Sequence, residues 1–132
     1  MSENSWRQSF ESVCRELEMA NRKKNALDDL LAKNRMSRPT YEYLSRNLDE
    51  EISRLETHLK SLTKNMNKRI DELRKQIRLL EGFLAHLELL HVGFEVDEKT
   101  YNQHRDAIID GIEASKGEMR EIEKALEKIG NE

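Results

Sequence analysis

Apolar residues recur every three or four positions from Tyr41 to His91, the spacing of a helix that packs against other helices. All the steps are of three or four residues, and an extra step of four between Met66 and Ile70 is interpreted as a local stutter. Proline is absent from this stretch, and Gly82 is its only glycine. The pattern predicts one central helix over about residues 38–92, with a seam of about 50 residues that spans roughly 75–80 Å at ~1.5 Å per residue. The seam consists of Tyr41, Leu44, Leu48, Ile52, Leu55, Leu59, Leu62, Met66, Ile70, Leu73, Ile77, Leu80, Leu84, Leu87 and His91.

Two shorter stretches with the same spacing predict flanking helices over residues 5–34 and 97–130. Asn4 or Ser5 can cap the first of these helices by accepting an unpaired backbone N–H. Lys24 lies within its apolar stripe, where we expect the ammonium group to reach solvent. The first seam consists of Trp6, Phe10, Val13, Leu17, Ala20, Lys24, Leu27 and Leu31, and the second of Tyr101, His104, Ile108, Ile112, Ser115, Met119, Ile122, Leu126 and Ile129.

Turn signals separate the three predicted helices. Ser37 is placed to cap the central helix, and Pro39 falls in its first turn, where a missing N–H costs nothing. Gly93 is predicted to take the left-handed conformation that ends a helix, with Phe94 as the apolar contact that follows. Asp97 then caps the third helix. Because short turns make neighbouring helices antiparallel, the predicted fold class is all-α, built from antiparallel coiled-coil hairpins.

The two turns also suggest an internal repeat of 60 residues. Thr40-Tyr41 recurs as Thr100-Tyr101, and the predicted cap Ser37 recurs as Asp97. One interpretation is a pair of tandem hairpins, residues 6–65 and 66–129, within a single helical domain of residues 1–132. The other is chance, because two seams with steps of three and four coincide in many registers.

Composition suits thin helical packing better than a thick core. Hydrophobic residues make up 36% of the chain and charged residues 37%, against about 45–50% and about 25% in typical globular domains. The single cysteine, Cys14, excludes an internal disulfide and favours a reducing compartment. No apolar run approaches the roughly 18–20 residues of a membrane span, and no signal-peptide core follows Met1. We therefore expect a cytoplasmic protein.

The last part of the central helix is apolar over more of its circumference than one neighbouring helix can cover. The helices either bunch there into a three-helix bundle or expose a surface for a second copy of the chain. We favour self-association, with a dimer as the first expectation. The predicted oligomerisation or partner residues are Leu79, Phe83, Leu90, Val92, Phe94 and Ile109.

A basic stretch between Lys60 and Arg78 is the alternative candidate site, because a basic helix face can bind nucleic-acid phosphates or an anionic bilayer. The predicted anion-binding residues are Lys64, Lys68, Arg69, Arg74, Lys75 and Arg78. Three observations argue against this function: the net charge is −3, no aromatic residue interleaves the stretch, and carboxylates of the third helix are expected beside it. Those carboxylates are Glu113, Glu118, Glu121, Glu123 and Glu127.

The chemistry-bearing residues form no pattern that predicts catalysis, a cofactor or a metal. His86, His91 and His104 lack the tight spacing of zinc ligands. Cys14 has no identifiable base beside it, and acidic pairs on a helical rod have no cleft that could separate their pKa values. We therefore expect neither an enzyme nor a cofactor-binding protein.

Both helical hairpins consist of a leucine stripe, a short turn and a capped restart, Ser37-Arg38-Pro39-Thr40-Tyr41 in one case and Asp97-Glu98-Lys99-Thr100-Tyr101 in the other. From about Leu27 to Leu126, this arrangement resembles the coiled-coil region of archaeal CdvA-like cell-division proteins. The resemblance implies a coiled coil that self-assembles and works with ESCRT-III-type division machinery. The sequence thus predicts a non-enzymatic scaffold or adaptor that mediates protein–protein interaction, and nucleic-acid or membrane-surface binding through residues 60–78 is the alternative.

Overall fold

The computed structural model describes residues 5–130, and in that part of the chain the backbone forms helices and turns only. The helices are α1 (Ser5–Ala32), α2 (Arg38–Val92) and α3 (Glu98–Gly130). The all-α prediction is confirmed, and each predicted helix end lies within two residues of the observed one. The cap predicted at Asn4 lies outside the described residues.

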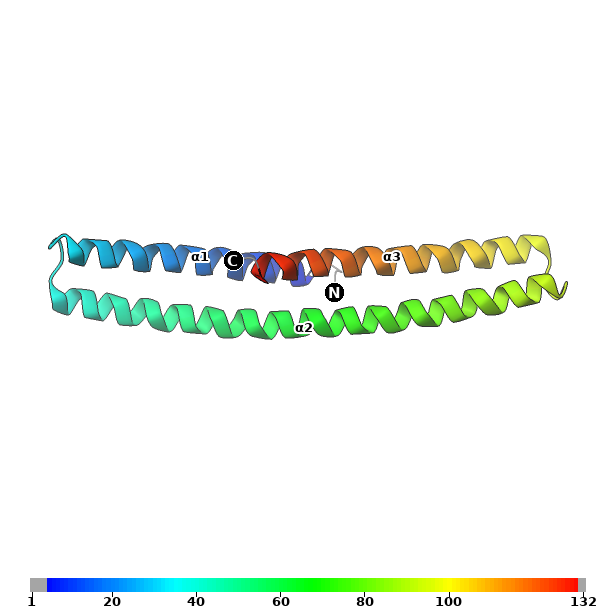
Figure 1. Cartoon of the computed structure of the whole chain (residues 1–132), viewed down its shortest axis with the longest axis horizontal. Helices are drawn as coiled ribbons and strands as arrows, with labels where there is room; N and C mark the ends of the chain where they lie inside the picture. The colour runs from blue at the N-terminus through cyan, green and yellow to red at the C-terminus, as the bar shows by residue number, and fades with distance from the viewer. Residues whose placement is uncertain (1–4, 131–132) are drawn as a thin grey trace. The chain divides into compact units, whose positions relative to one another are not determined.

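The chain divides into two compact units, one ending at Asn65 and the other beginning at Met66. The first, hairpin 1, contains α1 antiparallel to the first part of α2, and the second, hairpin 2, contains the rest of α2 antiparallel to α3 (Figure 1). Helix α2 is continuous over 55 residues, through the predicted stutter.

The turns that close the two hairpins share the same hydrogen bonds, 60 residues apart. In turn 1 (residues 33–38), the backbone N–H of Arg35 donates to the carbonyl of Leu30 at 2.9 Å, and that of Asn34 donates to Leu31 at 3.0 Å. In turn 2 (residues 93–98), the N–H groups of residues 95 and 94 donate to the carbonyls of residues 90 and 91, at 2.9 and 3.2 Å. This pair of bonds is the Schellman motif, which satisfies the last carbonyls of a helix.

The left-handed residue of turn 2 is Phe94, so the prediction that Gly93 takes this conformation is wrong. Phe94 has φ 57° and its counterpart Asn34 has φ 56°, whereas no glycine of the described residues has a positive φ. The Schellman bonds determine this position, because the left-handed residue must directly precede the one whose N–H reaches back five residues. Phe94 therefore carries the left-handed backbone with a side chain that is 94% exposed.

Matching side chains also restart the two helices. The N–H of Thr40 donates to Ser37 Oγ at 3.3 Å, and that of Thr100 donates to Asp97 Oδ1 at 2.7 Å, so both predicted caps are confirmed. The N–H of Thr100 also holds the pKa of the Asp97 carboxyl below its usual value, because it stabilises the charged form.

A tyrosine four residues beyond each cap ties the new helix back to the old one. Tyr41 Oη donates to Asp28 Oδ1 at 2.7 Å, and Tyr101 Oη donates to Glu88 Oε1 at 2.6 Å. The bond to Glu88 raises the pKa of Tyr101, because the neutral phenol is the donor. In hairpin 2 the ring of His91 stacks on that of Tyr101, with the centroids 3.8 Å apart.

The seam is buried more deeply in hairpin 2 than along the hairpin 1 part of α2. Between Tyr41 and Leu62 the α2 seam is half-buried, apart from Leu44, which is 37% exposed. The buried apolar residues of hairpin 2 are Met66, Ile70, Leu73, Ile77, Leu87, Tyr101, Ile112 and Ile122, and those of α1 are Phe10, Val13, Ala20 and Leu27.

Lys24 breaks the α1 seam without being left unpaired. Its Nζ donates to Ser45 Oγ at 2.6 Å and to Asp49 Oδ1 at 2.7 Å, both on α2. The bond to Asp49 raises the pKa of Lys24, which stays charged. The ammonium group thus reaches the surface, where it pairs across the hairpin with the exposed Asp49, and this pairing favours one register of α1 against α2.

Candidate interaction surfaces

Most of the apolar residues predicted for oligomerisation are exposed in hairpin 2. Leu79, Phe83, Val92 and Phe94 are 59%, 53%, 74% and 94% exposed. The other two predicted residues, Leu90 and Ile109, are half-buried. The sequence-based set missed Leu89, which is 71% exposed, although the same excess of apolar residues on α2 pointed to it.

Leu79, Phe83 and Leu90 lie four and seven residues apart, so they follow one face of α2. We call these three residues the apolar face. Gly82 lies beside it, and a Cβ added there would meet nothing within 4 Å. No neighbour in hairpin 2 therefore explains a glycine inside this helix, where it costs about 1 kcal/mol relative to alanine.

Hairpin 1 provides an internal comparison, because the same fold positions recur there 60 residues earlier. Phe83 and Leu89 correspond to Lys23 and Asp29, which are exposed and charged. The other correspondences are Leu79 with Met19, Gly82 with Arg22, Leu90 with Leu30, Val92 with Ala32, Phe94 with Asn34 and Ile109 with Asp49. The fold therefore does not require the apolar side chains at positions 83, 89, 94 and 109, whereas the counterparts of Leu79, Leu90 and Val92 are apolar in hairpin 1 as well.

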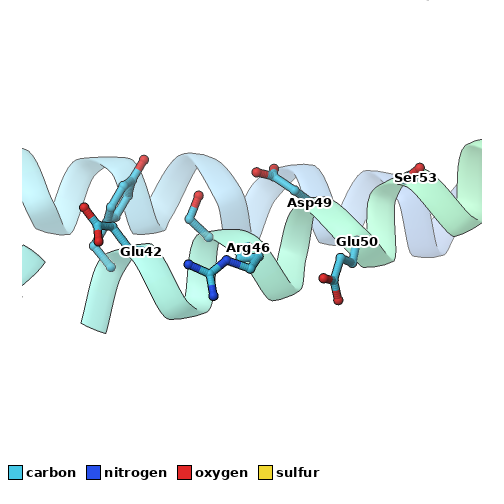
Figure 2. A pocket seen from close by; sticks show the side chains of 7 residues that line it. Glu42, Arg46, Asp49, Glu50 and Ser53 are labelled. Carbon is cyan, nitrogen blue, oxygen red and sulfur yellow. The ribbon is translucent and has the colours of Figure 1, made fainter. Parts of the chain in front are cut away.

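The hollows on the surface offer little enclosure for a substrate. One is lined only by α2 residues between Tyr41 and Ser53, whose polar side chains project from successive turns of that one helix (Figure 2). Another lies in hairpin 1 between residues 16–23 of α1 and 51–58 of α2. A hollow on a single helix leaves its side chains open to water, which screens the electrostatic effects on which catalysis depends.

Among the described residues, no three His, Cys, Asp or Glu side chains gather in a way that could hold a metal ion. Of the three histidines considered as ligands, His91 stacks on Tyr101 and its Nε2 lies 2.6 Å from Glu98 Oε1. His104, which the sequence places in the seam of the third helix, is exposed instead. Across residues 5–130, the apolar stretches of the helices are too short to cross a bilayer.

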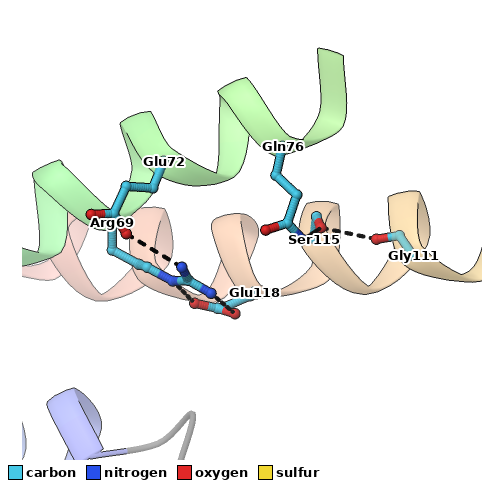
Figure 3. Close-up of polar contacts among 6 residues, drawn as sticks. All are labelled: Arg69, Glu72, Gln76, Gly111, Ser115 and Glu118. Carbon is cyan, nitrogen blue, oxygen red and sulfur yellow. Dashed lines mark hydrogen bonds and ion pairs between the residues drawn. The ribbon is translucent and has the colours of Figure 1, made fainter. Parts of the chain in front are cut away.

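The basic stretch is partly occupied by carboxylates of hairpin 2. Arg69 donates two hydrogen bonds to Glu118 of α3, at 2.6 and 3.1 Å, and it also pairs with Glu72 at 3.4 Å (Figure 3). Glu118 thereby raises the pKa of Arg69, and the expected pairing of α3 carboxylates with this stretch is confirmed at that residue. Arg74 pairs with Asp71 at 3.5 Å.

The remaining predicted anion-binding residues, Lys64, Lys68, Lys75 and Arg78, are exposed. Their spacing of 4, 7 and 3 residues places them along one face of α2. Arg69 and Arg74 are thus held by local ion pairs, whereas these four cations present their charge to solvent.

A second polar contact fixes the packing of α2 against α3. Gln76 Nε2 donates to Ser115 Oγ at 2.9 Å, and this hydroxyl donates to the Gly111 carbonyl at 2.9 Å (Figure 3). Gly111 allows a close approach, since a Cβ there would lie 3.2 Å from Leu80 Cδ1. These contacts serve the packing of hairpin 2 and leave Leu79 and Phe83 of the apolar face exposed.

Comparison with known proteins identifies the kind of chain that carries these surfaces. A family profile described as the CdvA-like coiled-coil domain matches residues 5–132, which confirms the resemblance inferred from the turns and leucine stripes. "Cell division protein A" of Sulfolobus acidocaldarius is 20% identical over 124 residues, which cover 94% of this chain and 52% of that protein. The chain thus spans about half the length of the curated relative it matches. No solved structure matches it at a significant level.

Proposed function

The chain belongs to the family of CdvA-like coiled-coil domains, and from this premise we propose that it is a non-enzymatic scaffold of cell division that self-associates and binds a protein partner. The name of the Sulfolobus relative supports the link to division. The observation that carries self-association is the apolar face of hairpin 2, whose counterpart in hairpin 1 includes Lys23 in place of Phe83. The ESCRT-III-type partner and the cytoplasmic location expected from the sequence belong to the same proposal.

The exposed area of the apolar face favours association of two copies. Burying the exposed half of Leu79 or of Phe83 is worth about 1 kcal/mol. In a two-fold dimer each of these side chains counts twice, because both copies use the same surface. The two residues then contribute about 4 kcal/mol, or roughly a thousandfold in the dissociation constant.

Sedimentation equilibrium of the purified chain tests this proposal. We expect a dimer, and we expect the double variant Leu79→Lys with Phe83→Lys to be a monomer of unchanged helix content. The matched control is Met19→Lys with Tyr43→Lys, because these residues are exposed to a similar degree, 51% and 62%, in hairpin 1. A wild-type chain that stays monomeric at high concentration, or a control that dissociates as readily, would contradict the proposal.

The four exposed cations of α2 support a second candidate function, binding of nucleic acid or an anionic surface. Such binding would weaken steeply with salt, because each phosphate contact releases counterions. Lys68→Glu with Lys75→Glu should abolish salt-dependent DNA retardation, while Lys124→Glu with Lys128→Glu on α3 serves as the control of equal charge change. Arg69 is unsuitable for this test because its substitution breaks the pair with Glu118.

The matching turns also support the proposal that the chain is a tandem repeat of one hairpin, residues 6–65 and 66–129. The Schellman bonds, the caps and the tyrosine bonds all recur at a spacing of 60. Expression of residues 66–132 alone tests whether hairpin 2 is such a unit: we expect a helical, cooperatively melting fragment. An unfolded fragment would contradict independent hairpins.

A further inference from the structure

Turns 1 and 2 have the same backbone hydrogen bonds but opposite charges. Turn 1 carries three cations and no anion between residues 33 and 38, and turn 2 carries three anions and no cation between residues 93 and 98. The cations are Lys33, Arg35 and Arg38, and the anions are Glu95, Asp97 and Glu98. All six residues are exposed. Arg35 and Glu95 are 60 residues apart and occupy equivalent positions in the two turns, and the same holds for Arg38 and Glu98.

Turn 2 also presents an apolar surface, which turn 1 lacks. Phe94, Val92 and Leu89 are 94%, 74% and 71% exposed, and we call them the apolar tip. The anions of turn 2 adjoin this tip in the sequence. An apolar patch with an acidic rim is complementary to a surface that is basic and contains short apolar groups. Turn 1 is such a surface, because its cations surround Met36 and are followed by Pro39.

We propose that turn 2 of one copy of the chain binds turn 1 of a second copy, with the apolar tip against turn 1 and the acidic rim against its cations. This inference rests on the proposed self-association in taking a second copy as the occupant. It adds a different contact, since the apolar face Leu79, Phe83 and Leu90 pairs with itself whereas the two turns pair with each other.

Local contacts leave part of this charge available: in turn 2, Glu98 lies 2.6 Å from His91 Nε2 and Asp97 accepts the N–H of Thr100, and no such side-chain contact is described for Glu95. In turn 1, Lys33 pairs with Asp29 at 2.9 Å and Arg38 lies 4.0 Å from Glu42. Both are exposed pairs between residues four apart in the chain, which exchange readily for other partners. Arg35, at the centre of turn 1, takes part in none of the ion pairs described for this turn.

The contact is heterologous, so two copies joined through one such contact keep one unused turn of each kind. Contacts of this type continue from copy to copy and build rings or open chains. Association through the apolar face stops at two copies, and association through the turns grows with protein concentration. The turn contact also weakens with salt, because its charges are exposed.

Charge exchange between the turns tests the proposal. Variant A, Arg35→Glu with Arg38→Glu, has two acidic turns, and variant B, Glu95→Arg with Glu98→Arg, has two basic turns. We expect the wild-type chain in low salt to grow beyond the dimer in light scattering, with at least a severalfold rise in mean mass as concentration increases. The mean mass of either variant alone should not rise with concentration. The mean mass of an equimolar mixture of A and B should rise again, because each turn then meets a turn of opposite charge on the other variant.

The same assay separates this proposal from the one on which it rests. In a Leu79→Lys, Phe83→Lys background, growth in low salt should persist even though the salt-resistant dimer is lost. The control Lys124→Glu with Lys128→Glu changes the net charge as variant A does and should grow like the wild-type chain. A mixture of A and B that stays at the mass of the separate variants would overturn the turn contact, and so would growth of A or B alone to the wild-type extent.

Discussion

Replacing Phe94 by asparagine should stabilise hairpin 2, although it removes a large apolar side chain. Phe94 has φ 57°, and this left-handed conformation costs a residue with an ordinary Cβ about 1–2 kcal/mol. Asparagine tolerates the conformation better because its short polar side chain bonds locally, and Asn34 holds the equivalent position with φ 56°. Phe94 is 94% exposed, so the substitution loses almost no burial.

The expected gain is about 1 kcal/mol in the free energy of unfolding, which corresponds to a rise of roughly 3 °C in the melting temperature for a chain of this size. Urea denaturation followed by circular dichroism measures this gain, in high salt and at low protein concentration so that association does not contribute. The variant Phe94→Ala is the control, because alanine removes the ring but keeps the strained Cβ. The reverse substitution Asn34→Phe should destabilise hairpin 1 by a similar amount.

The result that refutes this reasoning is Phe94→Asn with no more stability than Phe94→Ala. If the turn contact between copies is correct, the same Asn variant is more stable yet grows less in light scattering, since it lacks the centre of the apolar tip. The strained backbone of the exposed Phe94 would then have a functional explanation, because this side chain would serve the contact between copies rather than the fold of hairpin 2.

Three further substitutions test the turns and the apolar face. Gly93→Ala should raise the free energy of unfolding by about 0.4–1 kcal/mol, because Gly93 is not left-handed and an added Cβ would meet only ordinary contacts. The nearest of these contacts is the Leu89 carbonyl oxygen, at 3.4 Å. A clear fall in the melting temperature would mean that the backbone here needs glycine. Gly82→Ala should stabilise the monomer by about 1 kcal/mol, since a Cβ there meets nothing within 4 Å, and a drop in helix stability in dilute solution would disprove this. Asp97→Ser, which copies Ser37, tests the lowered pKa of Asp97: the carboxylate contributes stability above its unfolded value, near 3.8, and this contribution disappears as pH falls through the lower folded value. The melting temperature of the wild-type chain should therefore exceed that of Asp97→Ser by less below about pH 4. A difference that does not change with pH would show that the charge of Asp97 does not contribute to the stability of the cap.

Periodicity and turn chemistry were sufficient for the helices themselves. The repeat of three and four residues requires a helix because only that period places all the seam residues on one side. Ser37 and Asp97 could be assigned as caps because their oxygens are the acceptors that a helix start lacks. The left-handed residue was misassigned at Gly93 because glycine preference is only a tendency, whereas the bond from residue 95 to residue 90 decides the position. Aligning the two turns, with Asn34 opposite Phe94, would have found it.

The sequence by itself determined three helices, two turns and an excess of apolar residues near the end of α2, because these depend on local spacing and backbone chemistry. Only the tertiary structure decided which of those residues stay in contact with water. Leu90 and Ile109 are half-buried whereas Leu89 is 71% exposed, although all three are equally apolar in the sequence. The physical reason is that exposure depends on which side of α2 is covered by α3, and that is settled by packing between residues distant in the chain, such as Arg69 with Glu118 and Gln76 with Ser115.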